Sequence, residues 1–407
     1  MPRERSYKII IFIICFLAVG VGLGFLSGTK GLFLKPVTEA LNIPRTLYSI
    51  QDSIRYIVSA AVNVFLGFLV SKFGIKKLLL FGFSSLIAAC IINSFVSTAL
   101  ELYFAGLFLG LGFSFVGTTL VGLVADKWFD GKHKGKITGA ILCSNGLGAA
   151  AFTPIVENIL ISDIFGFRSA YRIIAAAIAF VALLTLVFFR DSAENAELRK
   201  KQAPSSSSDV EYDGDILRLP LFWSVALRVF VAGAVLQGIT GVASAHMADV
   251  GISGEFVGFV AAFSSVILTV SKFAIGSIHD RFGLRVSLIF CQICSVIAMI
   301  TLALSSSSAI GIVLAVVYSV FAPFALPLET VMIPLIAGGF FGKKNFGKTL
   351  GYLTAVNVVG YAVSGPILNA ASDFLGSYVP LFYIFAVLMI VMTVLTFFLP
   401  VNKKSEM

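Results

Sequence analysis

Apolar residues dominate this chain in stretches of about 20, separated by short polar or basic segments. A helix of that length crosses the hydrocarbon core of a bilayer, so each stretch predicts a transmembrane helix. Twelve spans are predicted, at about residues 9–30, 49–70, 78–97, 102–124, 137–160, 171–189, 219–245, 256–277, 285–304, 309–336, 348–371 and 379–399. With 58% hydrophobic and 13% charged residues, the composition excludes a water-soluble globular chain and predicts an all-α integral membrane protein.

One long polar segment interrupts the apolar stretches near the middle of the chain. Residues 190–218 are rich in charge and serine, which is typical of a flexible linker. This linker separates six predicted helices in residues 1–189 from six in residues 219–407. The sequence therefore predicts two six-helix bundles joined by a polar tether.

The two halves repeat each other at a spacing of about 210 residues. The matching pairs are Gly67 and Gly276, Lys72 and Arg281, Gly74 and Gly283, Lys76 and Arg285, Gly135 and Gly347, Lys136 and Lys348, Gly139 and Gly351, Asn145 and Asn357, Gly148 and Gly360, and Pro154 and Pro366. A parallel repeat of helical bundles is a transporter architecture, with the substrate site between the halves. We therefore expect alternating access by rocking of one half against the other.

Positive charge gathers in the segments that would lie on one side of the membrane. If the N-terminus is cytoplasmic, twenty-two of the thirty Lys and Arg residues fall in cytoplasmic segments. Five fall in segments on the other side, and Arg55, Arg228 and Lys272 fall inside spans. This positive-inside bias predicts cytoplasmic termini in a cell membrane, either plasma or inner. The net charge of +9 thus reflects topology and not a nucleic-acid partner.

A loop motif directly follows the eighth span: Gly276-Ser-Ile-His-Asp280-Arg281-Phe-Gly283-Leu-Arg285. It resembles the cytoplasmic loop motif of the major facilitator superfamily, G-x-x-x-D-R-x-G-x-R. A copy follows the second span of each half, so the resemblance extends over the whole chain through span count, repeat and loop positions. It implies a transporter fold of two six-helix bundles.

The residues of this motif suggest a conformational latch. Gly276 and Gly283 permit a tight turn and close approach of helices, while Asp280 with Arg281 and Arg285 can hold the cytoplasmic helix ends together. The first copy keeps Lys72 and Gly74, but Ser71 stands where the superfamily has Asp. The latch role is therefore expected chiefly of Asp280, and the alternative is that the basic residues only set topology.

Further loop segments resemble the branch of the superfamily that contains monocarboxylate transporters and oxalate:formate antiporters. They are Trp128-Phe129 with Gly135-Lys136-x-x-Gly139, Phe340-Phe341-Gly342 with Gly347-Lys348-x-x-Gly351, and Gly166-Phe-Arg168-Ser-Ala-Tyr171. In that branch a cation in the eighth span binds the substrate carboxylate, and Lys272 stands at that distance from the loop motif. A second cation, which the oxalate antiporter uses, is missing from residues 349–371, which argues against oxalate itself.

Ionisable residues inside spans cost about 2.5–3.5 kcal/mol each, so each needs a reason. Lys272 either binds an anion or snorkels to the nearby interface. Arg228, roughly 13 Å into the seventh span, is expected to face a cavity or to be paired. Glu329 can pair with Lys272 or Arg228, or carry a coupling proton. Asp52 and Arg55 share a helical face near the end of the second span and can pair with each other.

Two further patterns concern helix packing. Asn145 and Asn357 occupy equivalent mid-span positions, where Asn either binds substrate or links neighbouring helices. Gly20-x-Gly22-x-Gly24 in the first span predicts close helix packing, because no strand precedes it as in a nucleotide-binding loop.

These features predict a secondary transporter of a small, monocarboxylate-like organic anion, working by proton symport or exchange. The alternative is a facilitator for another solute class, by multidrug efflux or by uptake of a neutral or zwitterionic solute. No Ser-His-Asp set, metal cluster or phosphate loop is recognisable in the spans, so we expect no enzyme activity, no cofactor and no metal. The expected partners are a small-molecule substrate and the lipid bilayer, with a functional monomer.

Overall fold

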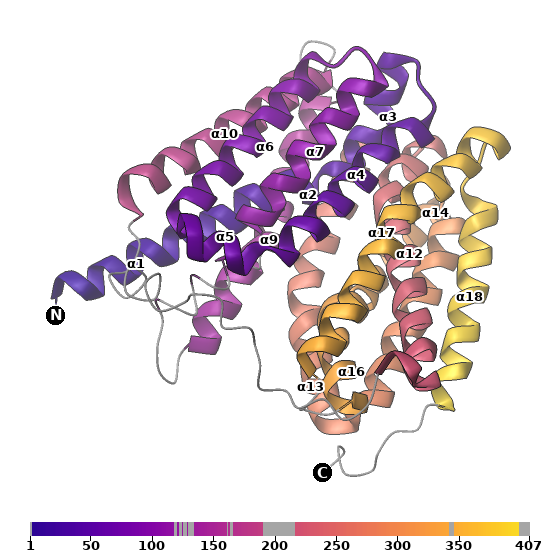
Figure 1. Ribbon diagram of the computed structural model, residues 1–407. Helices are drawn as coiled ribbons and strands as arrows, with labels where there is room; N and C mark the ends of the chain where they lie inside the picture. Colours follow the sequence, from indigo (N-terminus) through magenta and orange to yellow (C-terminus); the bar gives the residue numbers. More distant parts are fainter. Residues whose placement is uncertain are drawn as a thin grey trace. The chain divides into compact units, whose positions relative to one another are not determined.

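The fold is built from helices, as the apolar stretches predict (Figure 1). The computed structural model describes residues 2–117, 120–121, 124, 128, 134–160, 162, 166–189, 216–341 and 346–398. Within these residues no strand is present, and nine helices are long and apolar enough to cross a membrane. Together the nine hold ten of the predicted spans, because one of them holds two. The fifth span is the single helix Lys134–Leu160, and the second is divided into two shorter helices. The predicted span pattern is therefore confirmed.

The chain divides into two compact units. Unit 1 contains residues 1–43 and 54–206, and unit 2 contains residues 44–53 and 207–407. Most of the predicted tether, residues 190–215, lies outside the described residues. Its last part forms a short 3-10 helix, η2 (Ile216–Arg218).

Unit 1 contains the first six predicted spans. The first is continuous through α1 (Pro2–Leu17), the π-helix η1 (Ala18–Phe25) and α2 (Leu26–Gly28), and α3 (Lys30–Leu41) follows it. The second is broken at Phe65, between α4 and α5. The remaining bounds are α4 (Arg45–Val64), α5 (Leu66–Phe73), α6 (Ile75–Phe95), α7 (Ala99–Val116), α9 (Lys134–Leu160) and α10 (Gly166–Phe188). Of these, the first turns of α4 are grouped with unit 2.

Unit 2 contains the last six predicted spans. α12 begins at a proline, whose missing N–H is no loss in the first helical turn. The elements are α12 (Pro220–Asp249), α13 (Gly254–Ala303), α14 (Ala309–Ala325), α15 (Pro327–Thr330), α16 (Met332–Phe341), α17 (Phe346–Leu375) and α18 (Val379–Phe397). Because α13 holds the eighth and ninth spans, it must reverse direction within its length.

Both loop motifs turn at a glycine with left-handed backbone. Gly283 has φ 82° and ψ 176° inside α13, and Gly74 has φ 81° and ψ 161° between α5 and α6. Residues with a Cβ rarely adopt such angles, so glycine is required at both turns. The tight turn expected from the motif is therefore present in each unit.

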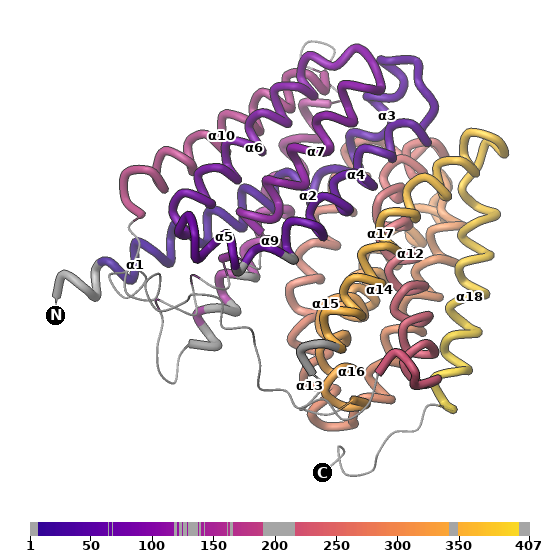
Figure 2. The backbone as a smooth tube through the Cα atoms, viewed as in Figure 1, coloured from indigo at the N-terminus to yellow at the C-terminus, as the bar shows by residue number. Residues whose placement is uncertain are grey.

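The tenth predicted span is broken into three helices. α14 ends at Ala325, α15 covers only Pro327–Thr330, and α16 begins at Met332. Pro327 lacks the N–H that would continue the ladder of α14, which accounts for the first break. Figure 2 shows these three elements in succession along the backbone of unit 2. Glu329 lies in the middle element, as is common for groups presented by discontinuous membrane helices.

Residues 44–53 are anchored within unit 2 through Arg45. Its guanidinium donates to Asp249 Oδ1 at 2.8 Å and to Tyr378 Oη at 2.9 Å. Asp373 accepts hydrogen bonds from the backbone N–H groups of Arg45 (2.9 Å) and Thr46 (2.8 Å). Burial acts to lower the pKa of Arg45, but the bonds to Asp249 and Tyr378 outweigh it and raise the pKa above its ordinary value. Arg45 therefore stays charged in this network.

Candidate functional site

A polar cluster around Glu329 lies among apolar helices of unit 2. Glu329 is only 7% exposed. Its Oε2 accepts a hydrogen bond from the Gln237 amide at 3.2 Å and another from the Tyr361 hydroxyl at 3.2 Å. A buried carboxylate needs such donors, because an unsolvated charge without hydrogen bonds is strongly disfavoured. The cluster therefore holds one ionisable group where it can exchange a proton or bind a cationic partner.

Three elements far apart in sequence build this cluster. Gln237 is on α12, Glu329 on α15 and Tyr361 on α17. Helices α12 and α17 lie side by side over most of their length (Figure 1). The short helix α15 packs against α12. The break at Pro327 interrupts the tenth span at the level of this helix pair, which points the carboxylate at groups from both.

Lys272 lies half-buried on α13, one turn before Gly276. The residue before it, Ser271, is buried and donates to the carbonyl oxygen of Pro323 at 2.7 Å. α13 also packs against α15, the element that carries Glu329. Lys272 thus lies on a helix that contacts the broken tenth span, and its substrate role stays a prediction.

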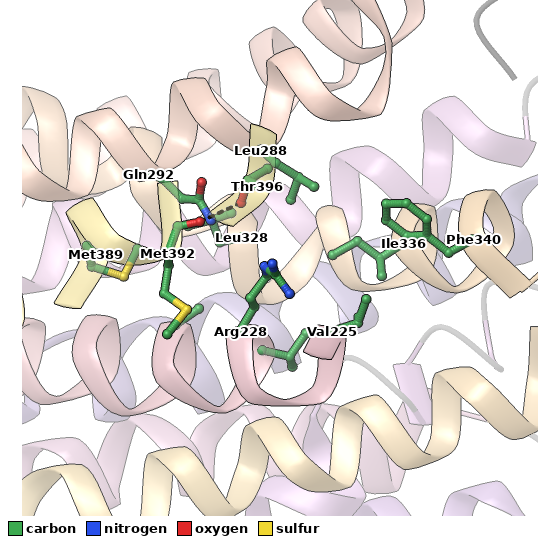
Figure 3. A pocket seen from close by; sticks show the side chains of 12 residues that line it. Val225, Arg228, Leu288, Gln292, Leu328, Ile336, Phe340, Met389, Met392 and Thr396 are labelled. Carbon is green, nitrogen blue, oxygen red and sulfur yellow. Dashed lines mark hydrogen bonds between the residues drawn. The ribbon is translucent and has the colours of Figure 1, made fainter. Parts of the chain in front are cut away.

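Arg228 lies in a different environment from Glu329. Its guanidinium donates to the carbonyl oxygen and the hydroxyl of Ser224, and to the carbonyl oxygen of Leu395 at 3.0 Å. Among the described residues it makes no ion pair, so of the two roles expected of Arg228 the cavity-facing one agrees with the structure (Figure 3). Pairing with Arg228 was one of three alternatives for Glu329, and the described contacts of Glu329 are instead with Gln237 on α12 and Tyr361 on α17.

The two mid-span asparagines differ in their surroundings. Asn357 is buried and its amide donates to the carbonyl oxygen of Val229 at 3.1 Å, which links α17 to α12. Asn145 is half-buried on α9, and its side chain has no hydrogen bond to another described residue. Of the two roles open to these residues, helix linkage is therefore seen at Asn357.

Three of the four charged latch residues are exposed. Asp280 is 85% exposed, and within the described chain its side chain contacts only His279, at 3.4 Å. Arg281 and Lys72 are exposed, and Arg285 is half-buried. Around Gly276 no described atom would come within 4 Å of an added Cβ. The close helix approach expected at Gly276 is therefore wrong for the described residues, while the turn at Gly283 is present.

Sequence analysis missed a cationic cluster in unit 1. Arg55 is buried, with its guanidinium 4.4 Å from the ring centroid of Tyr56 and 5.0 Å from that of Phe113. Lys30 donates to the Tyr56 hydroxyl at 3.3 Å. Aromatic faces stabilise buried cations. The available signal was the intramembrane position of Arg55 beside an aromatic residue.

A buried carboxylate in unit 1 was also missed. Glu157 is buried on α9, three residues beyond Pro154. An acidic residue inside a predicted span was the signal that could have found it.

The cysteines and other metal-binding side chains form no ligand set in the part of the chain that the structure describes. Cys291 and Cys294 are buried free thiols on α13. No group of three or more His, Cys, Asp or Glu side chains gathers among the described residues. Nothing in the described geometry therefore suggests where a metal or cofactor would sit.

Known transporters resemble this chain over between half and nearly all of its length. The oxalate:formate antiporter of Oxalobacter formigenes is 24% identical over 192 residues, which covers 47% of this chain and 44% of the antiporter. The multidrug resistance protein MdtG of Proteus mirabilis (strain HI4320) is 24% identical over 383 residues, which covers 91% of this chain and 90% of MdtG. A crystal structure of a mutant of the nucleoside transporter NupG superposes with a TM-score of 0.81 at 13% identity, over 96% of this chain and 99% of NupG.

The sequence pattern of one family matches both halves of the chain. The Major Facilitator Superfamily matches residues 10–246 and residues 229–406, which together leave only the two ends uncovered. This match agrees with the helical fold, the two loop motifs and the internal repeat. The chain is therefore a multi-pass membrane transporter that belongs to the Major Facilitator Superfamily.

Proposed function

We propose that this transporter moves a small organic anion across a cell membrane, by proton symport or by exchange of one anion for another. The observation that carries the proposal is Lys272, a cation held half-buried within a membrane span on the helix that packs against α15. A charge in that environment interacts with an anion more strongly than it would in water. The positive-inside bias supports cytoplasmic termini, and a functional monomer remains our expectation.

Two further groups fit a proton-coupled anion transporter: a pair of cations in unit 1 and the buried carboxylate in unit 2. Arg55 and Lys30 supply positive charge in unit 1 beside Tyr56. Glu329 supplies the group that would carry a coupling proton, because the donors Gln237 and Tyr361 hold its carboxylate in place whether it is ionised or protonated. Lys272 would then bind the substrate carboxylate as a point charge, without the two-pronged geometry of Arg.

Substitution of Lys272 tests the anion site. We expect Lys272→Gln to weaken anion transport about ten- to hundredfold, because one charge-assisted bond is lost, and Lys272→Arg to keep part of the activity. The measurement is uptake of labelled lactate, formate and oxalate into proteoliposomes. Lys77→Gln, which removes an exposed cation from the first turn of α6, is the matched control. Wild-type transport of any proven organic anion by Lys272→Gln would end the claim and would leave snorkelling as the role of Lys272.

The coupling role of Glu329 has its own readout. In Glu329→Gln a fixed neutral amide replaces the carboxyl group. We expect uptake driven by a pH gradient to be lost while exchange of anion for anion continues. If uptake still follows the pH gradient in this variant, Glu329 does not carry the proton.

A second candidate function has support from the likeness to MdtG, whose name is that of a multidrug resistance protein and which the chain matches over 90% of its length. NupG, whose fold this chain shares, is a nucleoside transporter, so the fold accommodates neutral solutes as well. Drug efflux or uptake of a neutral or zwitterionic solute would predict transport that is indifferent to Lys272→Gln. The same proteoliposome assay with cationic dyes and nucleosides therefore separates the two functions.

A further inference from the structure

One membrane helix of unit 1 is exposed on two separate faces that differ in chemistry. On α4, Ile57 is 60% exposed and Ala61 is exposed as well, and this apolar face suits contact with lipid. Asn63 is also exposed. At about 100° per residue, Asn63 lies about 120° around the helix axis from Ile57 and about 160° from Ala61. The exposure of Asn63 therefore belongs to a second face, which the apolar one does not explain.

Polar side chains continue along this second face. Tyr56, Ser59 and Asn63 fall within about 60° of one another around α4, and we call these three residues the α4 stripe. The Ser59 hydroxyl accepts from the Asn63 amide at 3.4 Å and from the Ser114 hydroxyl on α7 at 3.1 Å. Lys30 donates to the Tyr56 hydroxyl at 3.3 Å. The stripe is therefore fixed to α7 on one side and lies beside a positive charge.

The depth of Asn63 within the second span argues against contact with lipid. Helical rise places it about 27 Å from Arg45, where α4 begins, and about 15 Å from Phe73, where α5 ends. An asparagine side chain is too short to reach the membrane interface from there, as Lys or Arg can. An amide exposed to hydrocarbon loses its hydrogen bonds with water, which is strongly disfavoured. Asn63 is therefore expected to face water inside the membrane.

The equivalent helix of unit 2 has the same two faces. Asn63 and Lys272 occupy matching positions of the repeat, each four residues before the first glycine of its loop motif. Val266 and Val270, which match the apolar face of α4, are 45% and 58% exposed. Ser265 continues the polar face of α13 and is half-buried, as Lys272 is. The repeat has thus kept a polar face at this level in both units, with a cation in one and a neutral amide in the other.

We propose that the α4 stripe lines the aqueous substrate pathway and that Asn63 selects among substrates by hydrogen-bonding an uncharged polar group. The substrate class rests on the proposed function: a small organic anion that carries a hydroxyl or keto group besides its carboxylate. An amide can pair with either group, because it offers N–H donors and a carbonyl acceptor. A site that hydrogen-bonds a substrate hydroxyl discriminates against the analogue that lacks it, because the polar group of the site is then left unpaired.

Cysteine labelling of the full chain in membranes tests the pathway without knowledge of the substrate. Four of the five native cysteines are buried and Cys143 is half-buried, so Cys143→Ala supplies the background. The membranes are opened so that a charged, water-soluble methanethiosulfonate reaches both sides. We expect Asn63→Cys to react at least about tenfold faster than Ile57→Cys on the apolar face, because only an ionised thiol reacts. Equal rates would overturn the pathway.

Transport selectivity in proteoliposomes tests the hydrogen bond. Lactate and propionate differ by one hydroxyl group, and the ratio of their kcat/KM values does not depend on the amount of folded protein. We expect the wild type to favour lactate and Asn63→Leu to lower this ratio about three- to tenfold. Asn63→Gln keeps an amide and should keep part of the preference. Asn158→Leu removes an exposed amide near the end of α9, so it is the matched control and should leave the ratio unchanged.

The outcomes separate this inference from the proposed function. If lactate is transported but its ratio to propionate is the same in wild type and Asn63→Leu, the selecting role of Asn63 is overturned. If the wild type transports no monocarboxylate, the proposed function and the substrate class both fail, and the labelling rates still decide whether the stripe lines the pathway. Slower labelling of Asn63→Cys in the presence of lactate would support direct contact, and labelling that lactate leaves unchanged would contradict it.

Discussion

A close helix crossing occurs once in each unit: η1 crosses α9 in unit 1, and α12 crosses α17 in unit 2. Comparing the two crossings shows which contacts the repeat has kept and which it has not. In unit 1, an added Cβ on Gly24 would lie 2.6 Å from the backbone oxygen of Asn145 on α9. In unit 2, an added Cβ on Gly233 would lie 2.7 Å from the backbone oxygen of Asn357 on α17. The backbones of the paired helices therefore approach to nearly the same distance at equivalent positions.

A second glycine reinforces each crossing from the opposite helix. Gly148 faces the backbone of Gly20, and Gly360 faces the backbone oxygen of Phe230. Close approach of this kind lets membrane helices gain van der Waals contact where no hydrophobic effect drives them together. The expected close packing of Gly20-x-Gly22-x-Gly24 is thereby confirmed, and the duplication has preserved it in both halves.

The asparagine side chains at these crossings have diverged. Asn357 is buried and holds the Val229 carbonyl oxygen at 3.1 Å, whereas the Asn145 side chain has no hydrogen bond to a described residue. The crossing in unit 2 is therefore reinforced by a side-chain hydrogen bond between its two helices, and among the described residues the crossing in unit 1 has no such bond from Asn145. We therefore predict that Asn145, not Asn357, is the member of the pair that contacts a substrate.

The largest effect is expected at the glycine with the closest approach. An Ala at position 148 would place its Cβ against the Gly20 backbone, where no flexible side chain can move aside. We expect Gly148→Ala to lower the free energy of unfolding by about 1–3 kcal/mol, as overpacking does. Gly360→Ala, with 2.6 Å to the Phe230 oxygen, should cost less. Thermal unfolding in detergent measures both.

Gly351→Ala is the matched control for these two variants. It lies on α17, and no described atom would come within 4 Å of its added Cβ. We expect unchanged or slightly raised stability, because Ala favours a helix over Gly by about 0.5–1 kcal/mol. Equal losses in Gly148→Ala and Gly351→Ala would mean that the crossing does not depend on close backbone contact.

A smaller effect should distinguish the two asparagines. Asn357→Ala removes the bond to Val229, and interhelical hydrogen bonds in membranes average about 0.6 kcal/mol with a maximum near 1.7. We therefore expect a stability loss of about 1 kcal/mol with substrate KM nearly unchanged. Asn145→Ala should do the reverse, raising KM about three- to tenfold with little change in Tm. Matching changes in both variants would remove the distinction between the linking and the available residue.

Sequence reasoning succeeded where the cause is local. Hydropathy determines a span, and the chemistry of glycine determines the turn at Gly74 and Gly283, so both could be read from neighbouring residues. The partners of Glu329 could not, because they depend on how α12, α15 and α17 are rotated about their axes. Arg228 shows the same limit: its depth along α12 was predictable, but the helix that it meets was not.

The smallest effect on stability is expected at Asp280, and it bears on the unequal loop motifs of the two halves. Asp280 is 85% exposed with His279 as its contact in the described chain, whereas the first copy has Ser71 at the equivalent position. We expect Asp280→Asn to change the free energy of unfolding by less than about 0.5 kcal/mol, as exposed substitutions do. If Asp280 is a latch, it acts by biasing the inward and outward populations, and substrate affinity in the open state should stay the same. Accessibility of cysteine probes near Gly276 would measure that bias, with Ser71→Ala as the control from the other half. Identical labelling of wild type and Asp280→Asn would show that the charge at this loop does not control the conformational equilibrium.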